Sequence, residues 1–362
     1  MRAAVFVGVD EPLSVEKLTP IDPGPYDAVV RVGASGVCRS DLSLAHGHLP
    51  IPPPVILGHE GAGTVEAVGS AVTRVRPGDR VIAAFVPACG RCFFCVRDKS
   101  HLCEHGMDGM TIPKATRDDG SPLMAFSGLG TFSDQMTVHE SALVKVETDL
   151  PDEQLALIGC GVTTGVGAAL NTARVEPGST VAVIGCGGVG QSVIQGARIA
   201  GASRIIAIDP VELKRSAAVD FGATDLVDPA DGDPVAQVQA ITGGRGADFG
   251  FEVLGRPETI TQAYGVTRRG GTVTIVGMPS WDDQVTFSAF GMFYDEKRLL
   301  GCVYGSAQVH RDFPRFVSLA ETGRLDLGHM VSRRIALGEV NDAFRAMEAG
   351  EVIRSVITDS SR

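Results

Sequence analysis

Short apolar runs, broken by glycine and proline, fill roughly the first 150 residues of the chain. Runs of strand length occur at 3–9, 29–34, 63–68, 80–85 and 132–138. Such runs between turn-forming residues are typical of short β-strands. The first part of the chain is therefore predicted to be an irregular, β-rich domain.

After about residue 151 a strand pattern alternates with a helix pattern in longer units. The strands are predicted at 180–184, 204–208, 225–227, 248–253 and 272–276, and the helices at 189–200, 212–221, 234–241 and 258–266. Because strand and helix alternate, the strands are expected to pair in parallel. The predicted fold class is α/β, with a doubly wound parallel Rossmann sheet beside the β-rich domain.

A chain of 362 residues is long enough for two domains. The alternation of strand and helix stops near 299–304, and the last segment, with an apolar strand at 352–358, is expected to return to the first domain. The predicted division is 1–161 with 305–362 for one domain and 162–304 for the other.

The chain carries 32 basic and 43 acidic side chains, and its net charge of −11 repels phosphate backbones and anionic lipid. Neither nucleic acid nor a membrane is therefore expected as a partner. The opening apolar run is too short for a signal peptide, and no later stretch approaches eighteen uninterrupted apolar residues. A cytoplasmic location, where cysteines stay reduced, is the resulting expectation.

Four cysteines lie within fifteen residues in the pattern C-x2-C-x2-C-x7-C. They are Cys89, Cys92, Cys95 and Cys103. Thiolates at this spacing favour one tetrahedral zinc whose coordination sphere they fill, as in structural sites. Two disulfides, which need an oxidising compartment, and an iron–sulfur cluster are the alternatives. The sequence predicts a structural zinc lobe at about 86–106.

The predicted strand at 180–184 is followed by the run Gly185-Cys186-Gly187-Gly188-Val189-Gly190. This run matches G-x-G-x-x-G at the start of a predicted helix, where glycines permit a tight turn and close approach of a pyrophosphate. Asp209 ends the next strand, at the distance expected for the acid that binds the adenosine ribose. Since a carboxylate there repels a 2′-phosphate, NAD rather than NADP is predicted. Lys214 is either a further ribose contact or a solvated surface lysine.

Three more candidate metal ligands, Cys38, His59 and Cys160, lie far apart in the sequence. Taken alone, a cysteine is commonly a small buried apolar residue and a histidine a hydrogen-bonded polar one. The residues around them carry more information.

Residues 58–69 fit the pattern G-H-E-x2-G-x5-G. With the cysteine motif at 36–41, the four-cysteine segment, Cys160 and the glycine motif in the same order, the chain resembles the zinc-dependent alcohol dehydrogenases of the medium-chain dehydrogenase/reductase family. The resemblance covers essentially the whole chain and implies a GroES-like catalytic domain beside an NAD-binding Rossmann domain. The length resembles the longer, class III-like and commonly dimeric branch, which implies a homodimer with 286–305 as a candidate interface.

The resemblance implies that Cys38, His59 and Cys160 hold a catalytic zinc with one open position, so that each chain binds two zinc ions. Glu60 then lies beside the metal as a transient ligand or an outer group. Asp41 matches the family carboxylate that orients the zinc-bound histidine, and a turn-capping aspartate is its alternative.

The resemblance places Ser40 beside the alcohol oxygen as the first proton acceptor of a relay, and a helix cap is the alternative for this serine. Many relatives end the relay on a histidine three residues further along, where this chain has Ser43. His46, His48 or a chain of water molecules are the candidates for the exit of the proton.

Further residues match family positions around the cofactor. Arg39 and Arg354 correspond to arginines that contact the pyrophosphate. Thr164 and Val189 correspond to positions near the nicotinamide, with helix packing as the alternative for both.

Phe85 and Phe126 match walls of the substrate pocket, and aromatic core residues are the alternative. The arginine that recognises glutathione adducts in class III enzymes corresponds to Met107 here. The resulting hypothesis is NAD-dependent oxidation of primary alcohols to aldehydes and the reverse reaction. A thiol-dependent formaldehyde dehydrogenase using mycothiol or glutathione is one alternative, and a zinc-stabilised, non-enzymatic binding protein is another.

Overall fold

A computed structural model describes residues 1–358, which form two compact units. One unit contains Met1–Gly161 and the chain from Gln308 onward, and the other contains Val162–Ala307. The sequence analysis places the second boundary three residues earlier, before residue 305.

The first unit contains a sheet with the strand order β11-β7-β6-β4-β19-β18, in which β10 also pairs with β4. Its strands are β4 (Asp27–Gly36), β6 (Glu60–Val68), β7 (Arg80–Ala83), β10 (Gln135–His139), β11 (Leu143–Lys145), β18 (Val331–Ile335) and β19 (Arg354–Thr358). Alternate side chains of β4, Ala28, Val30 and Val32, pack in one core with Met136 and Val138 of β10. This alternation is the period of a strand with one face on a core.

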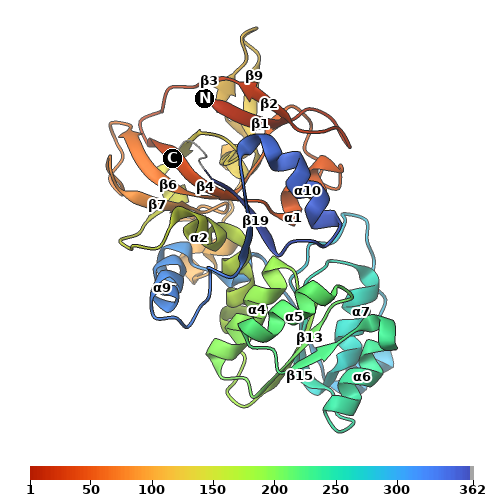
Figure 1. The fold of residues 1–362 in the computed structure, drawn as a ribbon. Helices are drawn as coiled ribbons and strands as arrows, with labels where there is room; N and C mark the ends of the chain where they lie inside the picture. Colours follow the sequence, from red (N-terminus) through yellow and green to blue (C-terminus); the bar gives the residue numbers. More distant parts are fainter. Residues whose placement is uncertain (359–362) are drawn as a thin grey trace. The chain divides into compact units, whose positions relative to one another are not determined.

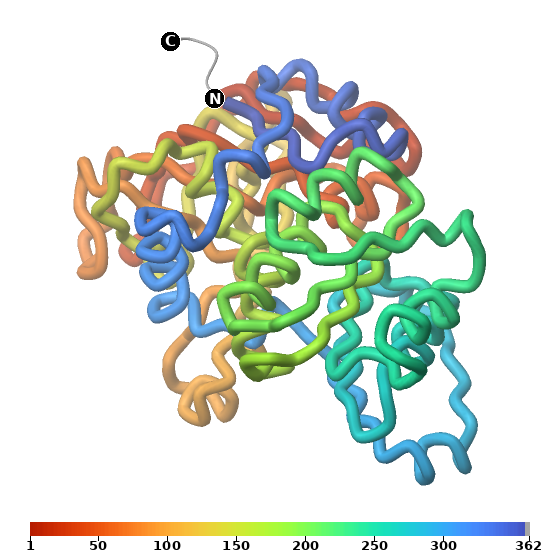
Figure 2. Tube along the Cα trace, turned by 60° about the horizontal axis from the view of Figure 1, so that its bottom comes forward, coloured from red at the N-terminus to blue at the C-terminus, as the bar shows by residue number. Residues whose placement is uncertain are grey.

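The end of the described chain completes this sheet. Strand β19 pairs antiparallel with β4, with Val356 opposite Gly36. Figure 2 shows the blue C-terminal segment beside red N-terminal segments of the same unit. The predicted return of the last segment therefore places Arg354, at the start of β19, in the same sheet as Glu60, at the start of β6.

A second group of strands in this unit has the order β2-β1-β5-β9-β8-β3. Its members are β1 (Arg2–Phe6), β2 (Ser14–Lys17), β3 (Thr19–Pro20), β5 (Val55–Ile56), β8 (Ala115–Thr116) and β9 (Pro122–Ala125). The helices of the unit are α1 (Arg39–Ala45), α2 (Asp152–Leu157), α9 (Val309–Glu321) and α10 (Val340–Glu348).

The second unit is built around a parallel sheet with the order β14-β13-β12-β15-β16-β17. The strands are β12 (Thr180–Ile184), β13 (Arg204–Ile208), β14 (Asp225–Val227), β15 (Ala247–Glu252), β16 (Thr267–Ile275) and β17 (Arg298–Gly301). The helices are α3 (Thr163–Gly167), α4 (Gly188–Ala200), α5 (Glu212–Phe221), α6 (Pro234–Ile241), α7 (Pro257–Val266) and α8 (Ala289–Asp295).

Helices pack in pairs around this sheet: α4 contacts α5, and α6 contacts α7 (Figure 1). The central strands β12 and β13 are mostly buried and apolar, and Ala182, Ile184, Ile206, Ile208 and Val273 share one core. The strand order reverses next to β12, as in doubly wound dinucleotide-binding sheets. The predicted α/β fold class is confirmed.

One continuous helix, Asp152–Thr172, is long and apolar enough to cross a membrane by length and composition, and 78% of its most apolar window is buried inside the protein. No uninterrupted apolar stretch marks this helix in the sequence, because glycines and threonines interrupt the run. Core helices of globular proteins have the same composition, so the finding assigns no membrane contact. The middle of this helix, Ile158–Val162, is a π-helical turn.

Candidate active site and metal centres

Four buried side chains from distant parts of the first unit meet at one point. The ligand atoms of Cys38, His59, Glu60 and Cys160 all lie within 4.8 Å of one another. Cys38 is the N-cap of α1, His59 directly precedes β6, Glu60 begins that strand, and Cys160 lies in the π-helical turn. Gly58 has a φ of +91°, and a Cβ there would collide with the backbone of Phe132, so this close approach requires glycine.

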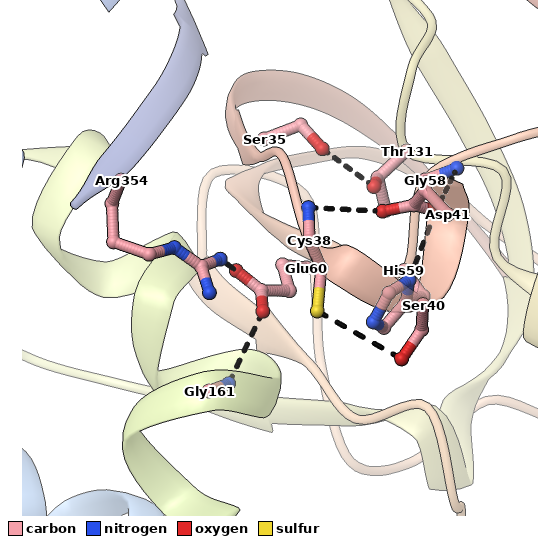
Figure 3. A network of polar contacts seen from close by, with 10 residues as sticks. All are labelled: Ser35, Cys38, Ser40, Asp41, Gly58, His59, Glu60, Thr131, Gly161 and Arg354. Carbon is pink, nitrogen blue, oxygen red and sulfur yellow. Dashed lines mark hydrogen bonds and ion pairs between the residues drawn. The ribbon is translucent and has the colours of Figure 1, made fainter. Parts of the chain in front are cut away.

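Asp41 fixes the orientation of the His59 ring (Figure 3). Asp41 Oδ1 lies 3.1 Å from His59 Nδ1 and accepts a hydrogen bond from the N–H of Gly58 at 3.1 Å. An ionised carboxylate only accepts hydrogen bonds, so Nδ1 carries the proton and the lone pair of the neutral ring is on Nε2. Asp41 Oδ2 also accepts from the N–H of Cys38 at 3.2 Å, so the capping alternative holds together with the orienting one.

The buried groups of this cluster shift one another's pKa values. A hydrogen bond from Cys160 is the largest influence on the Cys38 thiol and holds its pKa well below the ordinary value. Burial lowers the pKa of His59, but the charges of Asp41 and Cys38 outweigh burial and raise that pKa well above its usual range. Two sulfur donors and one imidazole nitrogen suit zinc, and three protein ligands are the number found in catalytic zinc sites. The donor set therefore fits zinc.

Glu60 lies between this cluster and Arg354 (Figure 3). Its Oε2 pairs with the guanidinium of Arg354, and its Oε1 accepts a hydrogen bond from the N–H of Gly161 at 3.1 Å. Both side chains are buried. Burial raises the pKa of Glu60 to about 8, although the charge of Arg354 opposes this shift.

The pairing of Glu60 with Arg354 and Gly161 is absent from the sequence analysis. The N–H of Gly161 is a backbone group, so the residue type at this position does not indicate the hydrogen bond to Glu60. The structure shows the Arg354 guanidinium buried against Glu60, and its contact with a pyrophosphate stays a prediction.

Ser40 and Arg39 lie in the first turn of α1. Ser40 Oγ is 3.9 Å from Cys38 Sγ, next to the cluster. Cys38 occupies the N-cap position, so the alternative that Ser40 caps this helix is wrong. Arg39 is exposed, and its phosphate contact stays a prediction.

Two aromatic rings stand edge-on to His59. The ring centroids of Phe85 and Phe126 lie 5.6 Å and 5.1 Å from that of His59, with interplanar angles of 82° and 78°. Phe126 also belongs to a buried apolar core. Both rings therefore border the cluster, and Phe85 also packs against a core, so core packing holds for both.

The four cysteines of the lobe converge as a second cluster. Their sulfur atoms lie within 4.8 Å of one another, with 3.9 Å between Cys89 and Cys95 and between Cys92 and Cys103. A disulfide needs about 2.05 Å, whereas Zn–S bonds of about 2.3 Å place tetrahedral sulfurs about 3.8 Å apart. All four thiols are free. The geometry fits a closed zinc site and contradicts the disulfide alternative.

The glycine loop of the second unit leaves space for a ligand. A Cβ at Gly187 would meet no atom within 4 Å, whereas one at Gly190 would collide with the carbonyl oxygen of Gly185, whose φ is +93°. Gly188 begins α4. As the motif requires, Gly185 makes the turn, Gly187 leaves room for a ligand to approach, and Gly190 makes the close backbone contact.

Asp209 is tied to this loop. Its Oδ2 accepts a hydrogen bond from the N–H of Cys186 at 2.8 Å, and its Oδ1 accepts from the N–H of Val211 at 2.9 Å. The carboxylate therefore holds the glycine loop against the end of β13, and its contact with a ribose stays a prediction.

The other residues expected around the cofactor lie in the same unit. Lys214 on α5 is half-buried, and its carbonyl accepts a hydrogen bond from Gln191 on α4. Thr164 on α3 and Val189 on α4 are partly exposed, and these two helices pack closely. Their contacts with NAD stay predictions.

Two family models match the chain. The alcohol dehydrogenase GroES-like domain matches residues 24–148, and the zinc-binding dehydrogenase domain matches residues 188–322. The predicted GroES-like domain is therefore confirmed.

Solved structures match the chain along its length. An alcohol dehydrogenase zinc-binding domain protein from Burkholderia ambifaria is 32% identical, with a TM-score of 0.93 over 99% of this chain and 98% of that one. Benzyl alcohol dehydrogenase from Acinetobacter calcoaceticus is 30% identical, with a TM-score of 0.92 over 99% and 98%. A putative zinc-binding dehydrogenase from Sinorhizobium meliloti 1021, bound to NADP, is 30% identical, with a TM-score of 0.82 over 99% and 98%.

The two domains and the two cysteine-containing clusters define a zinc-binding dehydrogenase. The chain belongs to the zinc-dependent alcohol dehydrogenases of the medium-chain dehydrogenase/reductase family and is an oxidoreductase of that family.

Proposed function

We propose that the protein oxidises primary alcohols to aldehydes with NAD and catalyses the reverse reaction. The observation that carries this proposal is the cluster of Cys38, His59 and Cys160, in which Asp41 fixes the imidazole with Nε2 free for a metal. When bound, zinc supplies Lewis-acid polarisation of the alcohol oxygen and NAD supplies the hydride acceptor. A relative that resembles this chain is a benzyl alcohol dehydrogenase.

Ser40 is the proposed proton acceptor. Its hydroxyl lies beside Cys38 without capping the helix, so it is available to a substrate hydroxyl bound at the cluster. Phe85 and Phe126 border His59 and offer apolar walls that exclude water around the reacting carbon. Beyond Ser40 the proton needs another acceptor, because this chain has Ser43, which lacks an imidazole, where many relatives have a histidine.

His46 is a poor candidate for the end of this relay. Both of its ring nitrogens face carboxylates, with Nδ1 at 2.6 Å from Asp10 and Nε2 at 2.9 Å from Glu348. A ring held at both nitrogens is less free to receive a proton from Ser40 and pass it on. His48, which is exposed, and a chain of water molecules remain the proposed exits.

NAD is the proposed cofactor on the strength of Asp209. Its carboxylate lies at the end of β13 and is anchored beside the glycine loop. A negative charge there opposes the 2′-phosphate of NADP. The Sinorhizobium meliloti structure is bound to NADP, so the family as a whole does not decide this point.

We propose a homodimer formed through the second unit. Strand β17 lies at the edge of the sheet, and large apolar side chains are exposed on the segment before it. Trp281 is 92% exposed, Phe293 is 79% exposed and Phe290 is 71% exposed. Exposed apolar surface beside an open sheet edge favours association with a second copy. Phe293→Lys should convert the dimer to a monomer in light scattering, and an unchanged mass would contradict this interface.

We infer a cytoplasmic location from the cysteines. The structure contains eight free cysteines and pairs none of them in a disulfide within residues 1–358. Reduced thiols are typical of proteins in a reducing compartment.

The experiment that tests the reaction is NADH formation across a panel of alcohols. The panel contains ethanol, benzyl alcohol and formaldehyde, the last with and without mycothiol or glutathione. Activity on the alcohols that needs no thiol supports the proposal, and activity that requires formaldehyde with a thiol favours the class III-like alternative. Ser40→Ala should lower kcat by about a hundredfold or more, while the control Ser43→Ala keeps it; equal effects would contradict the role of Ser40.

A further inference from the structure

Lys114 is a buried lysine without a partner for its charge. The residue is 8% exposed and lies directly before β8. Its position is fixed by two backbone hydrogen bonds, from its N–H to Leu123 at 2.8 Å and from the N–H of Ile21 to its carbonyl at 3.0 Å. Within residues 1–358, its ammonium group makes no hydrogen bond or ion pair. Lysine is rarely buried without a partner, because removing the ammonium from water is costly.

Lys114 lines a cavity of about 600 Å³ in the first unit. Ser127 lines the same cavity, is 6% exposed and has a φ of 54°. Among the residues described by the structure, the Ser127 hydroxyl has no hydrogen-bond partner either. Two buried donors therefore border one space without an acceptor.

A third donor lies at the same cavity. The N–H of Ser141 donates to Nδ1 of His139 at 3.1 Å, so Nδ1 is an acceptor and the proton of the neutral ring is on Nε2. His139 also stacks on Tyr26, with 6.0 Å between the ring centroids, which fixes the plane of the imidazole.

The carboxylates that line this cavity already accept hydrogen bonds from other groups. The pairs are Asp27 with the N–H of Gly24 at 3.0 Å, Asp108 with His105 at 3.0 Å, and Glu140 with the N–H of Thr73 at 2.7 Å. None of the three forms an ion pair with Lys114. Asp27 acts on the ammonium electrostatically, but no acid among the described residues of the cavity holds it in an ion pair.

We propose that this cavity binds a small oxyanion, a carboxylate or a phosphate, held by Lys114 and Ser127. An oxyanion offers only acceptors, which matches a set of donors that lack acceptors, and its bond to an ammonium is charge-assisted. The site is distinct from the proposed active site, because the residues lining the cavity include none of Cys38, His59, Glu60 and Cys160.

The proposal is tested by calorimetric titration of the zinc-loaded, full-length protein with inorganic phosphate and, separately, with acetate. One binding event is expected for at least one of the two anions. Lys114→Met keeps the length of the side chain and removes its charge, so it should weaken that event about tenfold or more. Lys17→Met, at an exposed lysine on β2, is the matched control and should leave binding unchanged. Equal binding by the Lys114→Met variant and the wild type would overturn the proposal.

A measurement on the wild type guards against misfolding of the variant. Burial lowers the pKa of Lys114, with Asp27 opposing the shift, which increases the share of neutral amine that a reagent entering the cavity can acylate. A bound oxyanion favours the charged ammonium and should slow acylation of Lys114 by a small succinimidyl ester. Peptide mass spectrometry measures the acylation rate, and the rate for the control Lys17 should not change. Protection by phosphate alone identifies a phosphate site, and protection by acetate identifies a carboxylate site. If neither anion slows the acylation of Lys114, the proposal is overturned.

Discussion

Asp41 Oδ1 lies 3.1 Å from His59 Nδ1, and the same oxygen accepts a hydrogen bond from the N–H of Gly58, the residue before this histidine. Asp41 thereby fixes both the ring and the turn that carries it. Its own position is set by α1, the helix that Cys38 begins. One carboxylate thus couples two of the proposed metal ligands.

Asp41→Asn should lower the zinc affinity of the Cys38–His59–Cys160 site. An amide in place of the carboxylate loses the negative charge that favours the Nδ1–H tautomer, and such changes typically cost about 10- to 100-fold in affinity. Competition with a chromophoric chelator measures the effect. The control Asp22→Asn, at an exposed position, should bind zinc like the wild type. Equal affinities for Asp41→Asn and the wild type would refute the orienting role.

Cys92→Ser should reduce the zinc content from two ions to one per chain. The four sulfurs of the lobe fill one coordination sphere, and loss of one thiolate opens it. Elemental analysis of the purified protein measures the content. Cys302→Ser is the control, because Cys302 is buried but lies in neither cluster, and it should keep both ions. Two ions retained in Cys92→Ser would show that the lobe is not a zinc site.

Asp209→Ser should shift cofactor preference toward NADP. The serine removes the charge that opposes the 2′-phosphate, and the ratio of kcat/KM for NAD to that for NADP should fall about tenfold or more, which corresponds to about 1.4 kcal/mol. Taking the ratio cancels any loosening of the glycine loop, since both cofactors use that loop. Asp220→Ser, exposed on α5, is the control. An unchanged ratio would falsify this account of selectivity.

Above about pH 8, where the Glu60 carboxyl is ionised, Arg354→Met should destabilise the protein by about 3–5 kcal/mol, because it leaves the buried carboxylate of Glu60 without its counter-charge. Urea denaturation of the zinc-loaded protein measures the free energy of unfolding. The double variant Glu60→Gln with Arg354→Met should recover much of the loss. Arg2→Met breaks an exposed pair with Asp134 and should cost less than about 1 kcal/mol. Similar losses for Arg354→Met and Arg2→Met would contradict the buried pair.

The His46 contacts predict a pH-dependent contribution to stability. The hydrogen bond to Asp10 is the largest influence on the pKa of His46 and raises it; burial, the next largest, lowers it, and Glu348 raises it further, so the net shift is upward. Since the folded pKa lies above the unfolded value of about 6.5, the contribution is fully present below that pH and is lost as pH rises through the folded pKa. His46→Gln should therefore cost more free energy of unfolding at about pH 6 than at about pH 9.

The matched control for this pH dependence is His48→Gln. The side chain of His48 makes no ion pair within residues 1–358, and its ring lies 6.1 Å from that of His46 between centroids. Its cost should be the same at both pH values. A pH-independent cost for His46→Gln would show that its carboxylate contacts do not stabilise the charged ring.

The parts of the fold with regular periodicity were within reach of the sequence. The predicted strand at 248–253 and helix at 189–200 correspond to β15 (Ala247–Glu252) and α4 (Gly188–Ala200) within one residue. The first unit is less regular. The predicted strand at 132–138 begins later, as β10 at Gln135, because Phe132 hydrogen-bonds with Ala4 of β1 and with Leu57, whereas β10 pairs with β4.

The candidate site divides in the same way. Cys38, His59 and Cys160 stand in family motifs, and the structure brings their ligand atoms together. The pairing of Glu60 with Arg354 joins residues 294 positions apart, and no spacing rule encodes it. Lys114 belongs to no sequence motif. Its ammonium group is buried without an ion-pair partner within residues 1–358, and this can be seen only in the folded chain.

Cys160 lies in the π-helical turn Ile158–Val162 of the helix Asp152–Thr172. Such a turn holds one residue more than an α-helical turn, and each residue advances an α-helix by about 100°. Deletion of one residue before Cys160 in this turn would restore an ordinary helix at little cost, yet it would rotate the sulfur away from Cys38. Relatives that lost such a residue in evolution would keep the helix and lose the ligand, so the metal site constrains the length of this segment more tightly than the fold does.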